Sequence, residues 1–341
     1  MGKHTIRDIA RMAGVSRSTV SLVLNDSPSV NAQTRQRVQE VIARVRYRPS
    51  AQARGLVSRR SRALALVFPE SDEIFRNFYL ADTVAGVLEA IIPRDYTLII
   101  EPATPQFIRN RVYESLFDEQ RVDGALAVWP RADDTFVARM RDAGHPLCLI
   151  NSRLDGAASV MANNLDGARL AARHLAALGH RDIACLRGPD HLAPGRDRHR
   201  GFVEALDEMA IPMPPPRCVF GSLTELSGYE GAGRLLRQWA TPPTALFTAN
   251  DMMALGAIRR LREAGLRVPD DVAVIGADDI LLAAYASPAL TTIRQSLSIL
   301  GRLAAEVLLN QIDHPGRPPE QQTIPAPLII RESCGAQSRP T

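Results

Sequence analysis

The stretch that decides the N-terminal fold is residues 5–25, TIRDIARMAGVSRSTVSLVLN. Thr5 is followed three positions later by Asp8, which predicts a capped helix start, and apolar residues then recur at helical spacing. Gly14 can take the left-handed conformation that ends a helix, and Ser16 can cap a second helix over residues 17–24. Two short helices joined by a tight glycine-containing turn predict a helix-turn-helix, whose second helix fits the major groove of DNA.

A third helix is predicted to begin after Asn31. Its buried face would carry Val38, Val41, Ile42 and Val45. Four arginines, at positions 35, 37, 44 and 46, lie on the opposite face. These arginines fit either contacts with phosphates or an ordinary solvated helix face.

Charge divides the chain into two parts. Residues 1–62 hold thirteen Lys and Arg against three acids, a net charge of +10, whereas the remaining residues hold 28 against 34, a net charge of −6. A basic head on an acidic body is typical of a nucleic-acid-binding module joined to another domain. Charge alone would equally fit an arm that binds RNA or a membrane surface, so the assignment to DNA depends on the helix-turn-helix.

Residues 5–25 resemble the headpiece of the lactose-repressor/galactose-repressor (LacI/GalR) family at nearly every position, and the likeness continues through Val30, Val38 and residues 47–49. The resemblance implies that Arg17, Ser18 and Leu22 face base edges, while hydroxyl and amide side chains hold phosphates and set the register. The headpiece residues assigned to DNA are Thr5, Ser16, Arg17, Ser18, Thr19, Ser21, Leu22, Asn25, Asn31 and Thr34.

Residues 53–56 resemble that family's hinge helix. In the family, the leucine at the position of Leu56 enters the minor groove at the operator centre, and Ala53 and Arg54 belong to the same contact. A helix of one or two turns that contains Gly55 is marginal by itself, so DNA and the partner hinge would have to stabilise it. The alternative is a plain linker.

From residue 62 the pattern alternates short apolar runs with amphipathic helices. Strands are expected near residues 63–68, 96–101, 124–129, 146–150, 183–186, 217–221, 244–248 and 272–276. This alternation predicts an α/β class with parallel, doubly wound sheets in two lobes and a ligand cleft at the carboxyl ends of the strands. The expected boundaries are a headpiece over 1–49, a hinge over 50–61 and a body over 62–334, with lobe 1 at 62–162 and 292–322 and lobe 2 at 163–291 and 323–334.

The body also resembles the same family, whose two-lobed body is like periplasmic binding proteins. The matching segments are residues 164–184, 198–202, 249–251, 274–279, 288–295 and 331–333. The resemblance places Arg198, Asn250 and Asp278 at the effector. Family members usually carry Asp where this chain has Asn163, so one charge often found beside the ligand is absent.

An arginine, an amide and a carboxylate suit a polyhydroxylated ligand, because they donate to and accept from vicinal hydroxyls. An aromatic wall is expected from Phe75, Phe78 or Tyr79, with Tyr79 the best match in register. Leu223 occupies a position where several members carry an aromatic residue. This difference disfavours a purine effector and favours a sugar.

Several other classes are not supported by the sequence. No phosphate loop, GxGxxG fingerprint, GxSxG elbow or HExxH motif occurs, so no catalytic residue, metal or cofactor is expected. The four cysteines form no CxxC pair and are expected to be small buried hydrophobes. The N-terminus has no apolar signal-peptide core and no membrane span is apparent, so a cytoplasmic location is expected.

The expected function is a ligand-responsive, sequence-specific transcription regulator, acting as a homodimer on a pseudo-palindromic operator. Repression of carbohydrate-metabolism genes, relieved by a small sugar, is favoured over DNA binding that a corepressor or a partner protein enhances. A periplasmic sugar-binding protein would share the body but not the basic head, and a fused sugar-processing enzyme would need a catalytic motif. The short polar tail after Ser333 lacks the leucine heptads of a tetramer-forming coiled coil.

Overall fold

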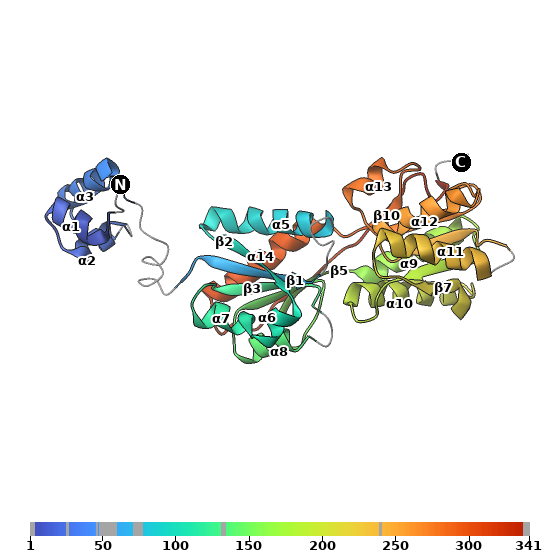
Figure 1. The fold of residues 1–341 in the computed structure, drawn as a ribbon, viewed down its shortest axis with the longest axis horizontal. Helices are drawn as coiled ribbons and strands as arrows, with labels where there is room; N and C mark the ends of the chain where they lie inside the picture. The colour runs from blue at the N-terminus through green and yellow to red at the C-terminus, as the bar shows by residue number, and fades with distance from the viewer. Residues whose placement is uncertain are drawn as a thin grey trace. The chain divides into compact units, whose positions relative to one another are not determined.

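The computed structural model describes residues 4–24, 27–45, 47, 60–70, 78–130, 134–238 and 241–336. The chain forms two compact units, Met1–Arg62 and Ala63–Thr341, which are described separately (Figure 1). Residues 50–59 of the hinge predicted over 50–61 lie outside the described residues.

The N-terminal unit is built from three helices, α1 (Ile6–Ala13), α2 (Arg17–Leu24) and α3 (Ala32–Val45). Thr5 and Asp8 form the predicted capping box, and Gly14 closes α1 in the left-handed conformation at φ 62°. Small aliphatic side chains from all three helices meet in one core that includes Ile9, Val20 and Val38. Because Val20 and Val23 hold α2 in this core, its opposite face is left to solvent.

The first lobe of the larger unit is a six-stranded sheet in the order β11-β5-β4-β3-β1-β2. Its strands are β1 (Ala63–Pro69), β2 (Thr97–Ala103), β3 (Gly124–Val128), β4 (Leu147–Ile150), β5 (Ala158–Ala162) and β11 (Gln321–Ile324), all parallel. Alternate residues of β1 enter two different cores, as the pleat requires. One face packs against α5 (Phe78–Ile91) and α14 (Leu297–Asp313), and the other against α6 (Pro105–Arg109), α7 (Val112–Asp118) and α8 (Thr135–Asp142).

The second lobe is a six-stranded sheet in the order β12-β10-β9-β8-β6-β7. Its strands are β6 (Ile183–Arg187), β7 (Cys218–Phe220), β8 (Ala245–Thr248), β9 (Ala273–Asp278), β10 (Thr291–Arg294) and the antiparallel β12 (Leu328–Ile329). One core joins this sheet to α9 (Asn164–Ala177) and α10 (Ala193–Glu208), and another joins it to α11 (Glu225–Gln238) and α12 (Asp251–Glu263). The short α13 (Leu281–Tyr285) follows β9, and single 3-10 turns occur at Ile92–Arg94 and Pro215–Arg217.

The lobe crossings, where the chain passes from one lobe to the other, differ from the expected positions. Residues 292–294 were expected in lobe 1, but β10 pairs with β9 of the second sheet, so the chain crosses after Arg294. Residues 323–324 were expected in lobe 2, but β11 pairs with β5 of the first sheet. The three crossing segments are tied together, since Asn163 donates its N–H to Ile324 (2.8 Å) and Arg294 donates to Pro327 (2.8 Å).

Helices α5 and α14 approach closely through two glycines. A Cβ added at Gly86 would lie 1.8 Å from the carbonyl oxygen of Ser298, and one at Gly301 would lie 2.1 Å from that of Thr83. We expect Gly86→Ala to lower the free energy of unfolding by at least about 1–3 kcal/mol, because backbone atoms must move apart. Urea denaturation monitored by circular dichroism measures this effect.

The matched control is Gly233→Ala in α11, where an added Cβ would meet only flexible arginine side chains at 3.2 Å or more. There the gain in helix propensity should leave stability unchanged or raised by up to about 1 kcal/mol. Equal losses in the two variants would show that the close approach of α5 and α14 does not limit stability.

Candidate DNA-reading surface and effector pocket

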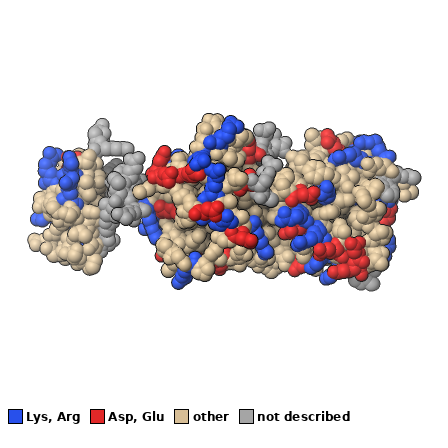
Figure 2. All heavy atoms as spheres, turned by 90° about the horizontal axis from the view of Figure 1, so that it is seen from below, with Lys and Arg blue, Asp and Glu red and all other residues tan. Residues whose placement is uncertain are grey.

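The exposed face of α2 carries the predicted DNA-reading side chains. Arg17, Ser18 and Leu22 are exposed, and Leu22 has 41% of its surface open although it is apolar. An exposed leucine beside an arginine and hydroxyl groups is suited to base edges, since it can contact a thymine methyl while the others form hydrogen bonds. Figure 2 shows basic side chains in this unit with little acidic surface, whereas the larger unit mixes both signs.

Three of the residues predicted to contact DNA also hold the helices in place. Thr5 caps α1; Ser16 Oγ accepts the Thr19 N–H (3.0 Å) at the start of α2, and Asn31 Oδ1 accepts the Thr34 N–H (2.8 Å) at the start of α3. Helix N-termini with polar caps are ready sites for phosphate oxygens. Ser21 is half-buried on α2, and Asn25, Ala53, Arg54 and Leu56 lie outside the described residues, so their DNA contacts remain predictions.

A small pocket of about 40 Å³ brings together four of the five predicted effector residues. Arg198 comes from α10, Leu223 precedes α11, Asn250 caps α12 and Asp278 ends β9, so three of these positions follow strands at the carboxyl edge of the second sheet. The pocket is also lined by Trp129, Leu192, Pro194 and Gly195. Trp129 follows β3 of the first lobe, so both lobes contribute to this site.

Tyr79 does not line the pocket, contrary to the prediction of an aromatic wall. Its ring is fully buried, with its centroid 3.8 Å from that of Trp129, so Trp129 is the aromatic residue at the pocket surface. Among the described residues, the aromatic wall therefore comes from Trp129 at the carboxyl end of β3 and not from Tyr79. Phe75 and the side chain of Phe78 lie outside the described residues.

Arg198 and Asp278 form a buried ion pair at 2.7 Å, with side-chain exposures of 4% and 10%. Arg198 also donates from Nε to Asn164 Oδ1 (2.8 Å) and from a terminal nitrogen to the Ala249 carbonyl. These three acceptors hold the guanidinium in one orientation beside Asp278 at the pocket. Burial raises the pKa of Asp278, and Arg198 opposes that rise.

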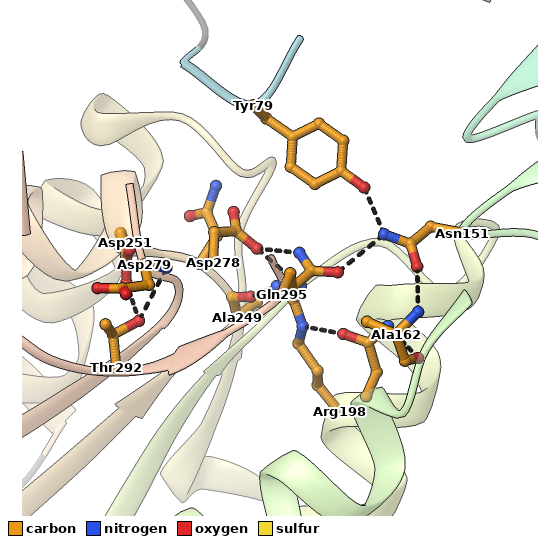
Figure 3. Close-up of polar contacts among 12 residues, drawn as sticks. Tyr79, Asn151, Ala162, Arg198, Ala249, Asp251, Asp278, Asp279, Thr292 and Gln295 are labelled. Atoms are coloured by element: carbon orange, nitrogen blue, oxygen red, sulfur yellow. Dashed lines mark hydrogen bonds and ion pairs between the residues drawn. The ribbon is translucent and has the colours of Figure 1, made fainter. Parts of the chain in front are cut away.

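A chain of side-chain hydrogen bonds runs from this ion pair into the first lobe (Figure 3). Gln295, which follows β10 at a lobe crossing, donates from Nε2 to Asp278 and accepts at Oε1 from Asn151 (2.8 Å). Asn151, which follows β4, also donates to the Tyr79 hydroxyl and accepts the Ala162 N–H (2.9 Å). Sequence reasoning missed Asn151, Gln295 and Trp129, although all three are polar or aromatic residues directly after strands.

Asp278 adopts φ 120°, a left-handed backbone conformation that residues with a side chain rarely take. The next residue holds it there, because the Asp279 carboxylate is bound by Arg294 (2.5 Å) and Arg331 (2.7 Å). Strain that the surroundings maintain is typical of functional sites. Here it turns the Asp278 carboxylate toward Arg198 and the pocket.

Asp251 lies behind the pocket with no exposed surface, and its carboxylate accepts from the Thr292 hydroxyl (2.5 Å) and the Ile280 N–H (2.9 Å). Burial, followed by the nearby Asp278 charge, raises its pKa to about 7. The folded state therefore keeps a proton that the unfolded chain releases near pH 4, so this group's stabilising contribution is present below pH 4 and is lost as pH rises to about 7.

We expect the stability difference between Asp251→Asn and the native chain to depend on pH in that window. The variant's deficit in free energy of unfolding should shrink between pH 4 and pH 7, because only the native chain must ionise a buried carboxyl. Urea titrations at four pH values test this expectation. A deficit that is constant, or that grows with pH, would show that Asp251 is ionised throughout.

Comparisons with known proteins agree with these two units. Residues 5–50 match the family described as bacterial regulatory proteins, lacI family, and residues 172–334 match a periplasmic binding protein-like domain. The HTH-type transcriptional repressor PurR of Erwinia tasmaniensis is 36% identical over 324 residues, covering 94% of this chain and 93% of the relative. The PurR of Escherichia coli O139:H28 is 34% identical over 333 residues, with 96% of each protein covered.

Solved structures show the same architecture. The lac repressor dimer bound to operator and the anti-inducer ONPF is 29% identical with a TM-score of 0.87, covering 98% of this chain and 99% of that one. The transcriptional regulator CelR in complex with cellobiose is 31% identical with a TM-score of 0.75, covering 97% and 99%. Within the described residues, no helix is long and apolar enough to cross a membrane.

Proposed function

The chain belongs to the lacI family of bacterial regulatory proteins, and on that premise we propose that it is a homodimeric repressor whose hold on operator DNA is relieved by a sugar bound between Arg198, Asn250, Asp278 and Trp129. A ligand-responsive DNA-binding regulator is what the family fixes; the sugar, its binding residues and the direction of the response are the proposal. We further infer that the protein acts in the cytoplasm, where its DNA target lies, and carries no catalytic activity.

The observation that carries the sugar proposal is the buried Arg198–Asp278 pair at the pocket. A carboxylate accepts from two vicinal hydroxyls while a guanidinium donates to their oxygens, which is the pattern a polyol presents. Trp129 offers an apolar ring face to the C–H groups of a sugar, and Leu223 packs without adding a second ring to stack a planar base. Two similar regulators have structures with cellobiose and with ribose bound, which supports the same class.

The hydrogen-bond chain supplies a route from ligand to lobe arrangement. Gln295 and the ligand would compete for Asp278 Oδ1, so ligand binding would release Gln295 and, through it, Asn151 of the first lobe. A ligand shifts an equilibrium only by its differential affinity for the two states. By linkage, a sugar that weakens DNA binding must itself bind less tightly to the DNA complex.

The direct test is fluorescence anisotropy of the full-length protein on DNA from upstream of its own gene, titrated with mono- and disaccharides. We expect tight, salt-sensitive binding that one sugar abolishes. Tight binding that one ligand strengthens would reverse the direction to corepression. Tight binding that no sugar alters would overturn the sugar proposal and favour a partner protein, and the absence of specific binding would overturn the assignment to operator DNA.

A further inference from the structure

Two cysteines face each other on neighbouring parallel strands in the second lobe. Cys185 of β6 and Cys218 of β7 are direct partners in the ladder. Neighbouring strands lie about 4.8 Å apart, which is inside the range of about 4.4–6.8 Å that disulfide-bonded residues span between their Cα atoms. Strand β7 is a three-residue edge strand, so it can shift toward β6 without disturbing a partner on its other side.

The surroundings of the two sulfur atoms are unequal. Cys185 is only 1% exposed and belongs to the core shared with α9 and α10, whereas Cys218 is half-buried at the sheet edge. His199 of α10 places Nε2 3.2 Å from Cys218 Sγ, and Arg187 lies two residues beyond Cys185 on the same strand. One sulfur is thus reachable by a small molecule and has basic neighbours, while the other is enclosed.

This geometry shifts the pKa values of the two thiols in opposite directions. The adjacent Cys185 thiol, then His199 and Arg187, lower the pKa of the Cys218 thiol, whereas the adjacent Cys218 thiol and burial raise the pKa of the Cys185 thiol. A thiolate with lowered pKa and solvent access is the usual target of peroxides, and a neighbouring thiol resolves the product.

We propose that Cys218 is a peroxide-reactive thiol whose oxidised form is resolved by Cys185 into a reversible disulfide. The Cys218 thiolate attacks one oxygen of hydrogen peroxide, which forms an S–O bond, breaks the O–O bond and releases hydroxide, which takes up a proton to become water. The Cys185 sulfur then attacks the Cys218 sulfenic sulfur, forming S–S and releasing the hydroxyl as water with the Cys185 proton. Two thiols are oxidised by two electrons, and one peroxide is reduced to two waters.

Oxidation at this place would reach the effector pocket through two short paths. His199 adjoins the pocket residue Arg198 on α10, and Cys218 precedes the pocket residue Leu223 by five positions. A disulfide removes the thiolate partner of His199 and draws β7 toward β6. The same event therefore acts close to two residues that line the pocket, Arg198 and Leu223.

The chain contains its own matched controls. Cys334 Sγ lies 3.3 Å from His174 Nε2, but it is 2% exposed and no second cysteine is paired with it in the described sheets. Cys148 is fully buried, and burial raises the pKa of its thiol. Neither should be oxidised at peroxide concentrations that convert Cys218.

The test uses the full-length reduced protein, exposed to hydrogen peroxide, quenched with an alkylating reagent and mapped by non-reducing peptide mass spectrometry. We expect a Cys185–Cys218 cross-linked peptide that dithiothreitol removes, and alkylation of Cys218 at pH 7 about tenfold faster than that of Cys148 or Cys334. Cys185→Ser should stop at a sulfenic acid that a 1,3-diketone traps on Cys218. Circular dichroism verifies that each variant is folded, and Cys185→Ala is a second choice if the serine is not tolerated in the core.

Three results would overturn the proposal. One is the absence of the cross-linked peptide from oxidised native protein, and another is a sulfenic acid on Cys148 or Cys334 at the same dose. The third concerns the pocket and uses Trp239→Phe, which leaves Trp129 as the single tryptophan. Peroxide should change the tryptophan fluorescence of this variant when Cys218 is present, and should leave it unchanged when Cys218→Ser is added. Equal emission in both would disprove the link to the pocket.

Discussion

Replacing Arg17 with alanine is expected to weaken operator binding by about 30-fold to about 10⁴-fold, since a bidentate arginine–guanine contact contributes about 1–3 kcal/mol and a dimer makes two. Arg17 is the first residue of α2 and is exposed, while Val20 and Val23 of the same helix are fixed in the core. The substitution therefore removes a reading side chain from a helix that remains in place. Anisotropy with operator and with a scrambled duplex at two salt concentrations measures the loss and its specificity.

Two variants accompany this measurement. Arg17→Lys keeps the charge but loses the planar fork, so it should retain nonspecific binding and lose most discrimination. Arg44→Ala, in the last turn of α3, removes an exposed arginine outside α2 and should cost at most a few-fold on either duplex. If alanine at position 17 weakened both duplexes equally, Arg17 would be a phosphate contact, and if it weakened neither, α2 would not be the reading helix.

The architecture of both units could be predicted from the sequence because the deciding signals are local. The capping box at Thr5, the left-handed Gly14 and the valines of α2 and α3 each follow from neighbouring residues. Strands β1, β3 and β8 are continuous apolar runs, as strands buried on both faces must be. Four strands were not predicted. The edge strands β11 and β12 do not require an apolar run, and the interior strands β5 and β10 contain serine or threonine residues that interrupt theirs.

The predicted positions of the lobe crossings and the prediction of Tyr79 as the aromatic wall were wrong for a different reason. Residues 291–294 and 321–324 are four-residue strands that end at the crossings, and which sheet each joins depends on pairing between distant segments. The rings of Tyr79 and Trp129 pack against each other, so sequence alone could not tell which ring faces the pocket. Arg198, Asn250 and Asp278 were found by resemblance, but the bonds of Gln295 and Asn151 between the lobes are visible only in three dimensions.

The second large effect is expected from the ion pair itself. Arg198→Met should lower the free energy of unfolding by about 3–5 kcal/mol at neutral pH, because it leaves a buried carboxylate without its counterion. Adding Asp278→Asn to that variant should recover much of the loss, since no unpaired charge remains. The control is Arg200→Ala, two residues further along α10, where the side chain is 57% exposed. This substitution should change the free energy of unfolding by less than about 0.5 kcal/mol.

The pH dependence and the ligand response separate the pair's structural and binding roles. Burial already raises the pKa of Asp278, and removing Arg198 takes away the group that opposes this rise, so the carboxyl of the single variant can fold protonated. Its stability deficit should therefore shrink as pH falls and grow as pH rises, whereas the deficit of the double variant, which has no carboxyl at position 278, should not grow as pH rises. Both variants should still bind operator DNA and should no longer release it with the effector. A double variant that regained stability and also regained release would show that the pair holds the lobe together but does not bind the ligand. If the double variant recovered none of the stability lost in Arg198→Met, the two side chains would not act on each other.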